Sequence, residues 1–187
     1  MSIFALLLLV GAAAQPSPSE PPCIFDGADL RTHEGATVDG CSSLSNKSVA
    51  VYFSGEWCPL CRRFTPALRE FHERYHDSVE VVFVSSDANR EDADQHFARS
   101  QGNWLQLAYD DAVAAKLKRK HRVWSGREVG TFGYNRRSGV PCVVVIDVQG
   151  DEVAFLAGER FGAAALREWE PEQAARWPAG ASIKAEL

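Results

Sequence analysis

The chain has 187 residues, an apolar fraction of 45%, a charged fraction of 24% and a formal net charge of −5. These values suit one globular domain with short tails and exclude a collagen-like or largely disordered chain. The acidic balance gives no whole-domain footprint for nucleic acid, so no nucleic-acid partner is expected. Five cysteines cannot all pair within one molecule, because their number is odd.

The two ends of the chain carry features of the secretory pathway. Residues 3–14 have no polar side chain, and this run is shorter than the roughly 20 residues of a membrane span but suits a secretory signal. The terminal Lys184–Leu187 resembles an endoplasmic-reticulum retention signal. We therefore expect a protein of the endoplasmic-reticulum lumen or a secreted one, without a membrane partner once the signal is removed, or a cytoplasmic protein if the segment is not a signal. The expected division is a signal peptide over 1–14, a Pro/Ser-rich leader over 15–28, a folded domain over 29–178 and a tail over 179–187.

Between the ends, hydrophobic periodicity predicts an α/β domain with a mixed sheet. In chain order we expect a strand over 49–54, a helix over 59–76, a strand over 79–85, helices over 90–101 and 111–121, a long loop over 123–139, a strand over 142–148, its hairpin partner over 152–157 and an Ala-rich helix over 162–169. The two early strands should be parallel because a helix connects them, and the late hairpin must be antiparallel. Asp87 or Asn89 can cap the helix that starts near residue 90.

Cys58 and Cys61 lie where the first strand ends and the first helix begins. Free N–H groups at a helix N-terminus stabilise a thiolate, so this position is expected to lower the pKa of Cys58, with Arg62 and Arg63 adding positive charge. Cys61 lies one helical turn further on and could resolve a mixed disulfide. Pro59 suits the first helical position, where its missing N–H costs nothing. The pair therefore indicates thiol–disulfide chemistry.

Metal binding and a purely structural pair are the competing interpretations. Cys58, Cys61, His72 and His76 have a spacing that superficially suggests a zinc finger. Here the spacer is one amphipathic helix, so Cys61 and His72 would be about 16 Å apart, whereas zinc ligands lie within about 2.3 Å of the ion. No metal is therefore expected. The five histidines are interpreted as surface or helix-face residues: His33, His72, His76, His96 and His121.

The segment Tyr52–Leu68, with its Tyr-Phe-Ser lead-in, Trp-Cys-Pro-Leu-Cys-Arg and Phe-Thr-Pro, resembles the active-site segment of the thioredoxin superfamily. The tryparedoxin and nucleoredoxin subgroup is the most similar. The resemblance continues through Val81–Asp87 and Gly139–Val145 and covers about residues 44–157. It implies a thioredoxin-like fold, in which helices flank a central mixed β-sheet.

The resemblance also implies roles for individual residues. Cys58 matches the attacking thiol, Cys61 the resolving thiol and Trp57 the aromatic residue that flanks them. Pro141 matches a cis-proline that faces the active site, and Val140 before it would offer backbone hydrogen bonds to an extended substrate. The residues expected to contact substrate are Trp57, Pro59, Leu60, Val140 and Pro141.

Three departures from the family pattern concern the redox potential, the proton route and substrate choice. Leu60 replaces a proline before the second cysteine. Tyr52 stands where thioredoxins carry a buried aspartate, although the tryparedoxin subgroup is similar to this chain at that position. Residues 124–137 look like an insertion that leads directly into Pro141.

Together, the cysteine pair and the resemblance predict a monomeric protein-disulfide reductase without a bound cofactor. Its partners would be disulfide-containing proteins and an external thiol reductant or reductase. The alternatives are a disulfide oxidase or isomerase in the secretory pathway, a thiol peroxidase, and a non-enzymatic client-binding module.

The remaining cysteines and a basic region leave further questions open. Cys23 and Cys41 are either a structural disulfide or two unrelated thiols, and Cys142 should pack as a small apolar residue. The basic region is either a solvated helix end and loop or a docking surface for an acidic partner. It contains Lys116, Lys118, Arg119, Lys120, Arg122, Arg127, Arg136 and Arg137, with only Glu128 opposing them.

Overall fold

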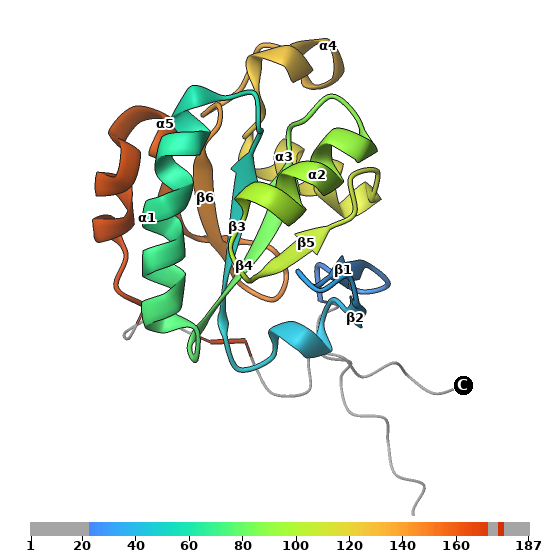
Figure 1. Ribbon diagram of the computed structural model, residues 1–187, viewed down its shortest axis with the longest axis vertical. Coiled ribbons are helices and arrows are strands. Elements are labelled where there is room, and N and C mark those ends of the chain that lie inside the picture. The colour runs from blue at the N-terminus through green and yellow to red at the C-terminus, as the bar shows by residue number, and fades with distance from the viewer. Residues whose placement is uncertain (1–22, 172–175, 178–187) are drawn as a thin grey trace, which may run out of the picture.

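A seven-stranded mixed sheet in the order β2-β1-β5-β4-β3-β6-β7 forms the centre of the computed structural model, which describes residues 23–171 and 176–177 (Figure 1). The expected signal peptide and retention signal lie outside the described residues. The strands are β1 (Asp29–Arg31), β2 (Thr37–Asp39), β3 (Ser48–Ser54), β4 (Val79–Ser85), β5 (Leu105–Leu107), β6 (Cys142–Ile146) and β7 (Glu152–Leu156). The helices are α1 (Pro59–Tyr75), α2 (Arg90–Ser100), α3 (Ala112–His121), α4 (Val129–Phe132) and α5 (Gly158–Phe161), with 3-10 helices η1 (Ser42–Leu44), η2 (Gly126–Glu128) and η3 (Gly162–Glu168).

The register of the sheet confirms the predicted mixed topology. β3 and β4 are parallel, from Ser48 opposite Val79 to Ser54 opposite Ser85. They can be parallel because α1 carries the chain back to the end of the sheet at which β3 begins. β6 is antiparallel both to β3 and to β7. Every residue of β3 and β4 is buried, as expected for strands covered on both faces.

Two hydrophobic clusters cover the two faces of the sheet. Alternate residues of β3 point to opposite clusters, since successive side chains of a strand face opposite ways. Tyr52 packs with Phe64 and Leu68 of α1 and with Phe97 of α2, on the face that lies in front in Figure 1. Residues such as Val51 and Phe53 pack with α3 and the N-terminal segment on the other face, in the cluster that also holds Cys58 and Cys61.

Helix boundaries follow local signals closely. Pro59 begins α1, as predicted, and α1 continues past Pro66 to Tyr75. The side chain of Asn89, not that of Asp87, caps α2 by accepting a hydrogen bond from the Asp92 N–H. Asp111 caps α3 in the same way.

Sequence periodicity missed β1, β2 and β5. Each of these strands has only three residues, which is too short to show an alternating pattern. β1 pairs antiparallel to β5 and extends the sheet, and the disulfide Cys23–Cys41 closes the segment that contains β1 and β2. Residues 23–28, expected to belong to an extended leader, contribute four buried side chains to the core: Cys23, Ile24, Phe25 and Ala28.

Two further expectations about secondary structure were wrong. The predicted loop over 123–139 contains η2 and α4, whose combined length of one or two turns leaves no clear period. The Ala-rich segment near 162–169 forms the 3-10 helix η3 rather than an α-helix. Beyond it, Trp177 is buried against Phe25 and its indole N–H donates to the Ile146 carbonyl at 3.0 Å.

Candidate functional site

The local sequence places the Cys58 sulfur at the start of α1. Cys58 is the N-cap residue, with extended backbone, and Pro59 follows at the first helical position. The Cys61 backbone N–H donates to Cys58 Sγ at 3.3 Å, so the sulfur occupies the place of a capping oxygen. A sulfur in this position faces the positive end of the helix dipole, which favours negative charge there.

A second contact to Cys58 comes from a distant part of the chain. The thiol of Cys58 donates to the carbonyl oxygen of Val140 across 3.4 Å. The Val140–Pro141 peptide bond is cis, as the sequence resemblance implies. These two residues reach the site because β6 pairs with β3, with Cys142 opposite Phe53.

Cys61 lies deeper than Cys58. Its exposed fraction is 1%, against 5% for Cys58, and the two sulfurs are not bonded to each other. Burial, together with a hydrogen bond that the Cys61 thiol donates to Cys58, raises the pKa of Cys61 well above its ordinary value. Cys61 therefore keeps its proton at neutral pH. Of the two cysteines, only Cys58 lines the surface groove at this site.

The aromatic residue beside the pair is held on both sides. The Trp57 indole N–H donates to the Ser86 carbonyl at 3.0 Å, just after β4. On its open side the Arg127 guanidinium lies 4.1 Å from the centroid of the ring, which is a cation–π contact. Trp57 thereby becomes a fixed wall of the site.

A groove of about 330 Å³ runs past Cys58. Five of the sequence-predicted site residues line it: Trp57, Cys58, Pro59, Leu60 and Val140. Leu60 exposes 44% of its surface there, and Cys61 and Pro141 are buried behind the lining. The structure thus brings all seven predicted residues together, although their roles in catalysis and substrate contact stay predictions.

Sequence reasoning did not include the segment 124–137 among the site residues. Ser125, Gly126, Arg127 and Arg136 of this segment line the same groove. The available signal was the direct connection of the segment to Val140 and Pro141. Figure 1 shows the segment that carries α4 at the same end of the molecule as the start of α1.

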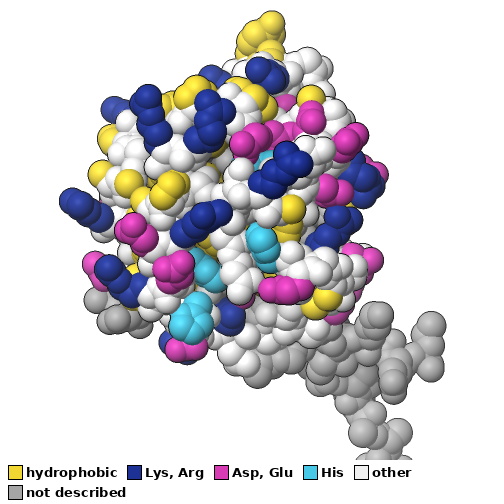
Figure 2. All heavy atoms as spheres, in the orientation of Figure 1, with side chains coloured by type: hydrophobic (Ala, Val, Ile, Leu, Met, Phe, Trp, Pro, Cys, Tyr) yellow, Lys and Arg dark blue, Asp and Glu magenta, His cyan; other side chains and the backbone are white. Residues whose placement is uncertain are grey.

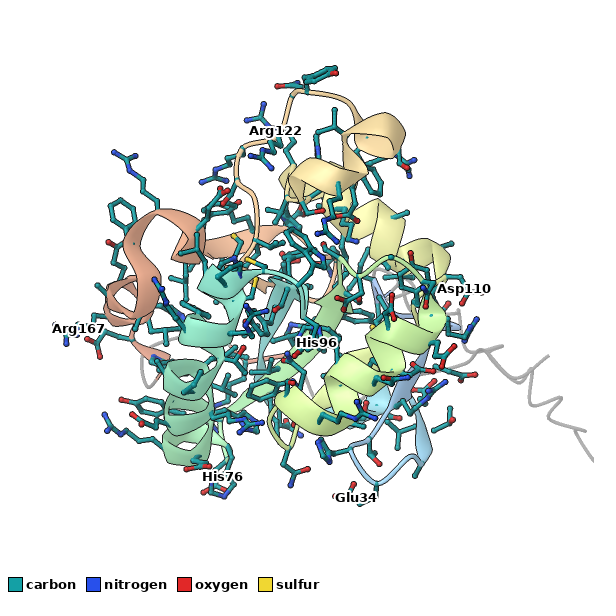
Figure 3. The ribbon with its side chains drawn as sticks, turned by 45° about the horizontal axis from the view of Figure 1, so that its top comes forward. Glu34, His76, His96, Asp110, Arg122 and Arg167 are labelled. Atoms are coloured by element: carbon teal, nitrogen blue, oxygen red, sulfur yellow. A yellow bond between two sulfur atoms is a disulfide. The ribbon has the colours of Figure 1, made fainter. Side chains whose placement is uncertain are left out.

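Of the five histidines expected at the surface or on a helix face, His72, His96 and His121 lie on the buried faces of α1, α2 and α3. His96 points inward from α2 (Figure 3), and its Nδ1 lies 2.8 Å from Oδ2 of Asp87. Asp87 also accepts a hydrogen bond from the Glu56 N–H at 2.8 Å, so the pair anchors the loop that presents Trp57. Burial also lowers the pKa of His121.

The basic region is not one solvated patch. Lys118 is buried, and its ammonium donates to the Ser85 carbonyl at 2.6 Å and to Glu128 at 2.5 Å. Lys120 pairs with Asp151 at 2.8 Å, and Arg137 pairs with Glu152 at 2.6 Å. Arg127 and Arg136 are the members that line the groove.

The zinc-like spacing does not gather ligands, because α1 is continuous between Cys61 and His72. Within 23–171 and 176–177 no group of three or more His, Cys, Asp or Glu side chains is placed to hold a metal ion. None of the helices in this part of the chain is long and apolar enough to cross a membrane.

The fold and the Cys-x-x-Cys helix start define a thioredoxin-like oxidoreductase domain. A family model described as thioredoxin-like matches residues 46–152, and the chain belongs to this family. The chain is 44% identical to tryparedoxin of Trypanosoma brucei brucei over 70 residues, which are 36% of this chain and 47% of that protein. It is 33% identical to mouse (Mus musculus) nucleoredoxin over 128 residues, 66% of this chain and 26% of that protein. The chain thus spans less than half the length of these two relatives.

Solved structures show the same fold. A thioredoxin from Wuchereria bancrofti is 33% identical, has a TM-score of 0.62 and is matched over 81% of this chain and 93% of that one.

The tryparedoxin and nucleoredoxin relatives, which are proteins of the cytosol or nucleus, overturn the expected location in the secretory pathway. The apolar run over 3–14 was a weak basis for that expectation, because no basic residue precedes it as in a typical secretory signal.

Proposed function

We propose that this protein is a thiol–disulfide oxidoreductase of the protein-disulfide reductase type. The observation that carries the proposal is the position of Cys58 Sγ, which caps α1 at the edge of an open groove with Cys61 one turn behind it. A sulfur there borders the groove that a substrate disulfide would enter and accepts a hydrogen bond from an N–H group of the first turn of α1.

The reaction has two displacement steps. The Cys58 thiolate attacks one sulfur of a protein disulfide, and the other substrate sulfur leaves as a thiolate. Cys61 then loses its proton and attacks Cys58 Sγ, which breaks the mixed disulfide and releases the second substrate sulfur. The substrate gains two electrons, the protein ends as a Cys58–Cys61 disulfide, and an external dithiol reductant restores both thiols.

The division of roles between the two cysteines is supported by burial. Because the pKa of Cys61 is raised, this thiol stays protonated until the mixed disulfide changes its surroundings. Trp57, Pro59, Leu60 and Val140 would contact the substrate along the groove, with Pro141 holding Val140 in place.

The test is insulin reduction driven by dithiothreitol. Wild type should accelerate the reaction and Cys58→Ser should abolish the acceleration. Cys142→Ala, which removes a buried thiol of β6 that does not line the groove, should retain it. Cys61→Ser should accumulate a mixed disulfide with insulin that survives denaturation without reductant. Wild-type activity in Cys58→Ser would refute the proposal.

A further inference from the structure

The two arginines of the segment 124–137 give the groove a charge preference. We propose that the site selects disulfides whose attacked cysteine is flanked by aspartate or glutamate, and that Arg127 and Arg136 determine this selectivity. The inference rests on the proposed thiol–disulfide exchange at Cys58. Figure 2 shows Lys and Arg side chains gathered over the start of α1, with acidic side chains further along, over α2.

The segment is anchored rather than loosely attached. The buried Lys118 binds both Ser85 at the end of β4 and Glu128 in η2. Glu128 also accepts from the Ser125 backbone N–H at 2.8 Å, which ties the start of η2 to its last residue. Trp124 is buried and its indole N–H donates to the Gly133 carbonyl at 3.0 Å. These contacts hold Arg127 at a defined place above Trp57.

Arg127 is available to a substrate carboxylate. Its side chain is exposed, and its guanidinium carbon lies over Trp57, 4.1 Å from the ring centroid. Among the ion pairs of the described residues, none involves Arg127, whereas the neighbouring Lys118 and Arg136 each have an acidic partner. A guanidinium that is already held against an aromatic ring loses little conformational freedom when it binds a carboxylate.

The acidic groups near the groove do not cancel its charge. Arg136 lies 3.8 Å from Glu159, and Glu159 also accepts the Gly139 N–H at 2.6 Å. Glu56 does not line this groove but a neighbouring cavity that Trp57 and Arg127 also border, and its carboxylate is 3.4 Å from His96 Nε2. The groove beside Cys58 is therefore lined by two guanidinium groups and one carboxylate, Glu159, which is already hydrogen-bonded to the backbone.

The experiment compares two peptides that differ only in the charge beside cysteine. In one peptide the cysteine has two aspartates on each side, in the other two lysines, and each cysteine forms a disulfide with 2-thiopyridine. Cys58 attacks the peptide sulfur and 2-thiopyridone leaves; Cys61 then releases the peptide thiol and the Cys58–Cys61 disulfide forms. The rate of 2-thiopyridone release from each peptide is divided by its rate with dithiothreitol, which removes the intrinsic reactivity of the two disulfides.

Wild type should prefer the acidic peptide by about fivefold at low ionic strength, since each exposed charge pair contributes up to a few-fold. The preference should shrink as salt brings the screening length below about 10 Å. Arg127→Gln should reduce it at least twofold, Arg127→Lys should retain part of it, and the Arg127→Gln, Arg136→Gln double variant should abolish it.

Arg167→Gln is the matched control, because Arg167 is an exposed arginine on η3 that points away from the site (Figure 3). It should keep the wild-type preference. Equal rates for the two peptides in wild type, or an equal loss in Arg127→Gln and Arg167→Gln, would overturn the inference but leave the proposed function standing. Wild-type rates no higher than those of Cys58→Ser with either peptide would overturn both.

Discussion

The phenolic oxygen of Tyr52 lies 2.9 Å from Oγ1 of Thr65, in the core beneath Cys61. The Thr65 hydroxyl also donates to the Cys61 carbonyl at 2.9 Å, and it has only one hydrogen, so Tyr52 must be the donor to Thr65. Burial raises the pKa of Tyr52 well above its ordinary value, so this pair stays neutral. Two neutral hydroxyl groups thus connect β3 to the Cys61 carbonyl of α1. Tyr52, the first of them, stands where the family resemblance places an aspartate in thioredoxins.

Replacing Tyr52 by Phe should lower the free energy of unfolding by about 1 kcal/mol, the typical contribution of one buried hydrogen bond. Urea unfolding measures this change. Tyr109→Phe is the control. The Tyr109 hydroxyl donates to the Ala88 carbonyl at 3.0 Å in an exposed position, where water can replace the hydroxyl, so this substitution should lower the free energy of unfolding by less. Equal losses in the two variants would show that the Tyr52 hydroxyl bond adds nothing beyond a surface contact.

Cys142 should make stability fall as pH rises above 9. Burial raises the pKa of this thiol from 9.0 to about 12 in the folded protein. Between these values the folded state keeps a proton that the unfolded chain releases, so unfolding becomes easier by about 1.4 kcal/mol per pH unit. Cys142→Ala should remove this contribution.

The measurement is urea unfolding between pH 8 and 10 in a Cys58→Ser, Cys61→Ser background, where neither of those thiols titrates. The protein with Cys142 should lose stability more steeply than the one with Cys142→Ala. Parallel pH profiles would contradict the prediction. Tyr52, whose pKa is also raised, contributes equally to both proteins and cancels in the difference.

Loss of the Cys23–Cys41 disulfide should destabilise the fold by about 3 kcal/mol, because the unfolded chain is freed from a loop closed across 18 residues. The Cys23→Ser, Cys41→Ser variant tests this in chemical denaturation. β1 and β2 lie at the other end of the molecule from the start of α1 (Figure 1), so insulin reduction at 25 °C should be retained. A loss of turnover with intact folding would contradict the separation of the two regions.

Lys118→Met should leave the Glu128 carboxylate half-buried without its ammonium partner. Removing one member of a buried pair costs about 3–5 kcal/mol, and Lys118 and Glu128 expose only 7% and 17% of their side chains. We expect lower stability and faster tryptic cleavage after Arg127. Lys116→Met, an exposed lysine on the same helix, should change neither. Unaltered cleavage in Lys118→Met would mean that other contacts hold the segment.

The cores of β3, β4, β6 and α1 could be predicted because each carries its own signal. β4 contains the continuous apolar run Val81–Val84, and the buried residues of α1, such as Phe64 and Leu68, recur at helical spacing. β5, η2 and α4 have three or four residues each, so their conformation depends on neighbouring elements and not on their own periodicity.

Local sequence alone determined the position of the two thiols, because a strand, a turn and a proline at the first helical position specify a helix start. Only the tertiary structure decided what surrounds them. Val140 reaches Cys58 through the pairing of β6 with β3. Arg127 reaches Trp57 because the buried Lys118 anchors Glu128 beside it. Both contacts join residues about 70 to 80 positions apart, and side-chain pairing over such separations leaves no periodic trace in the chain.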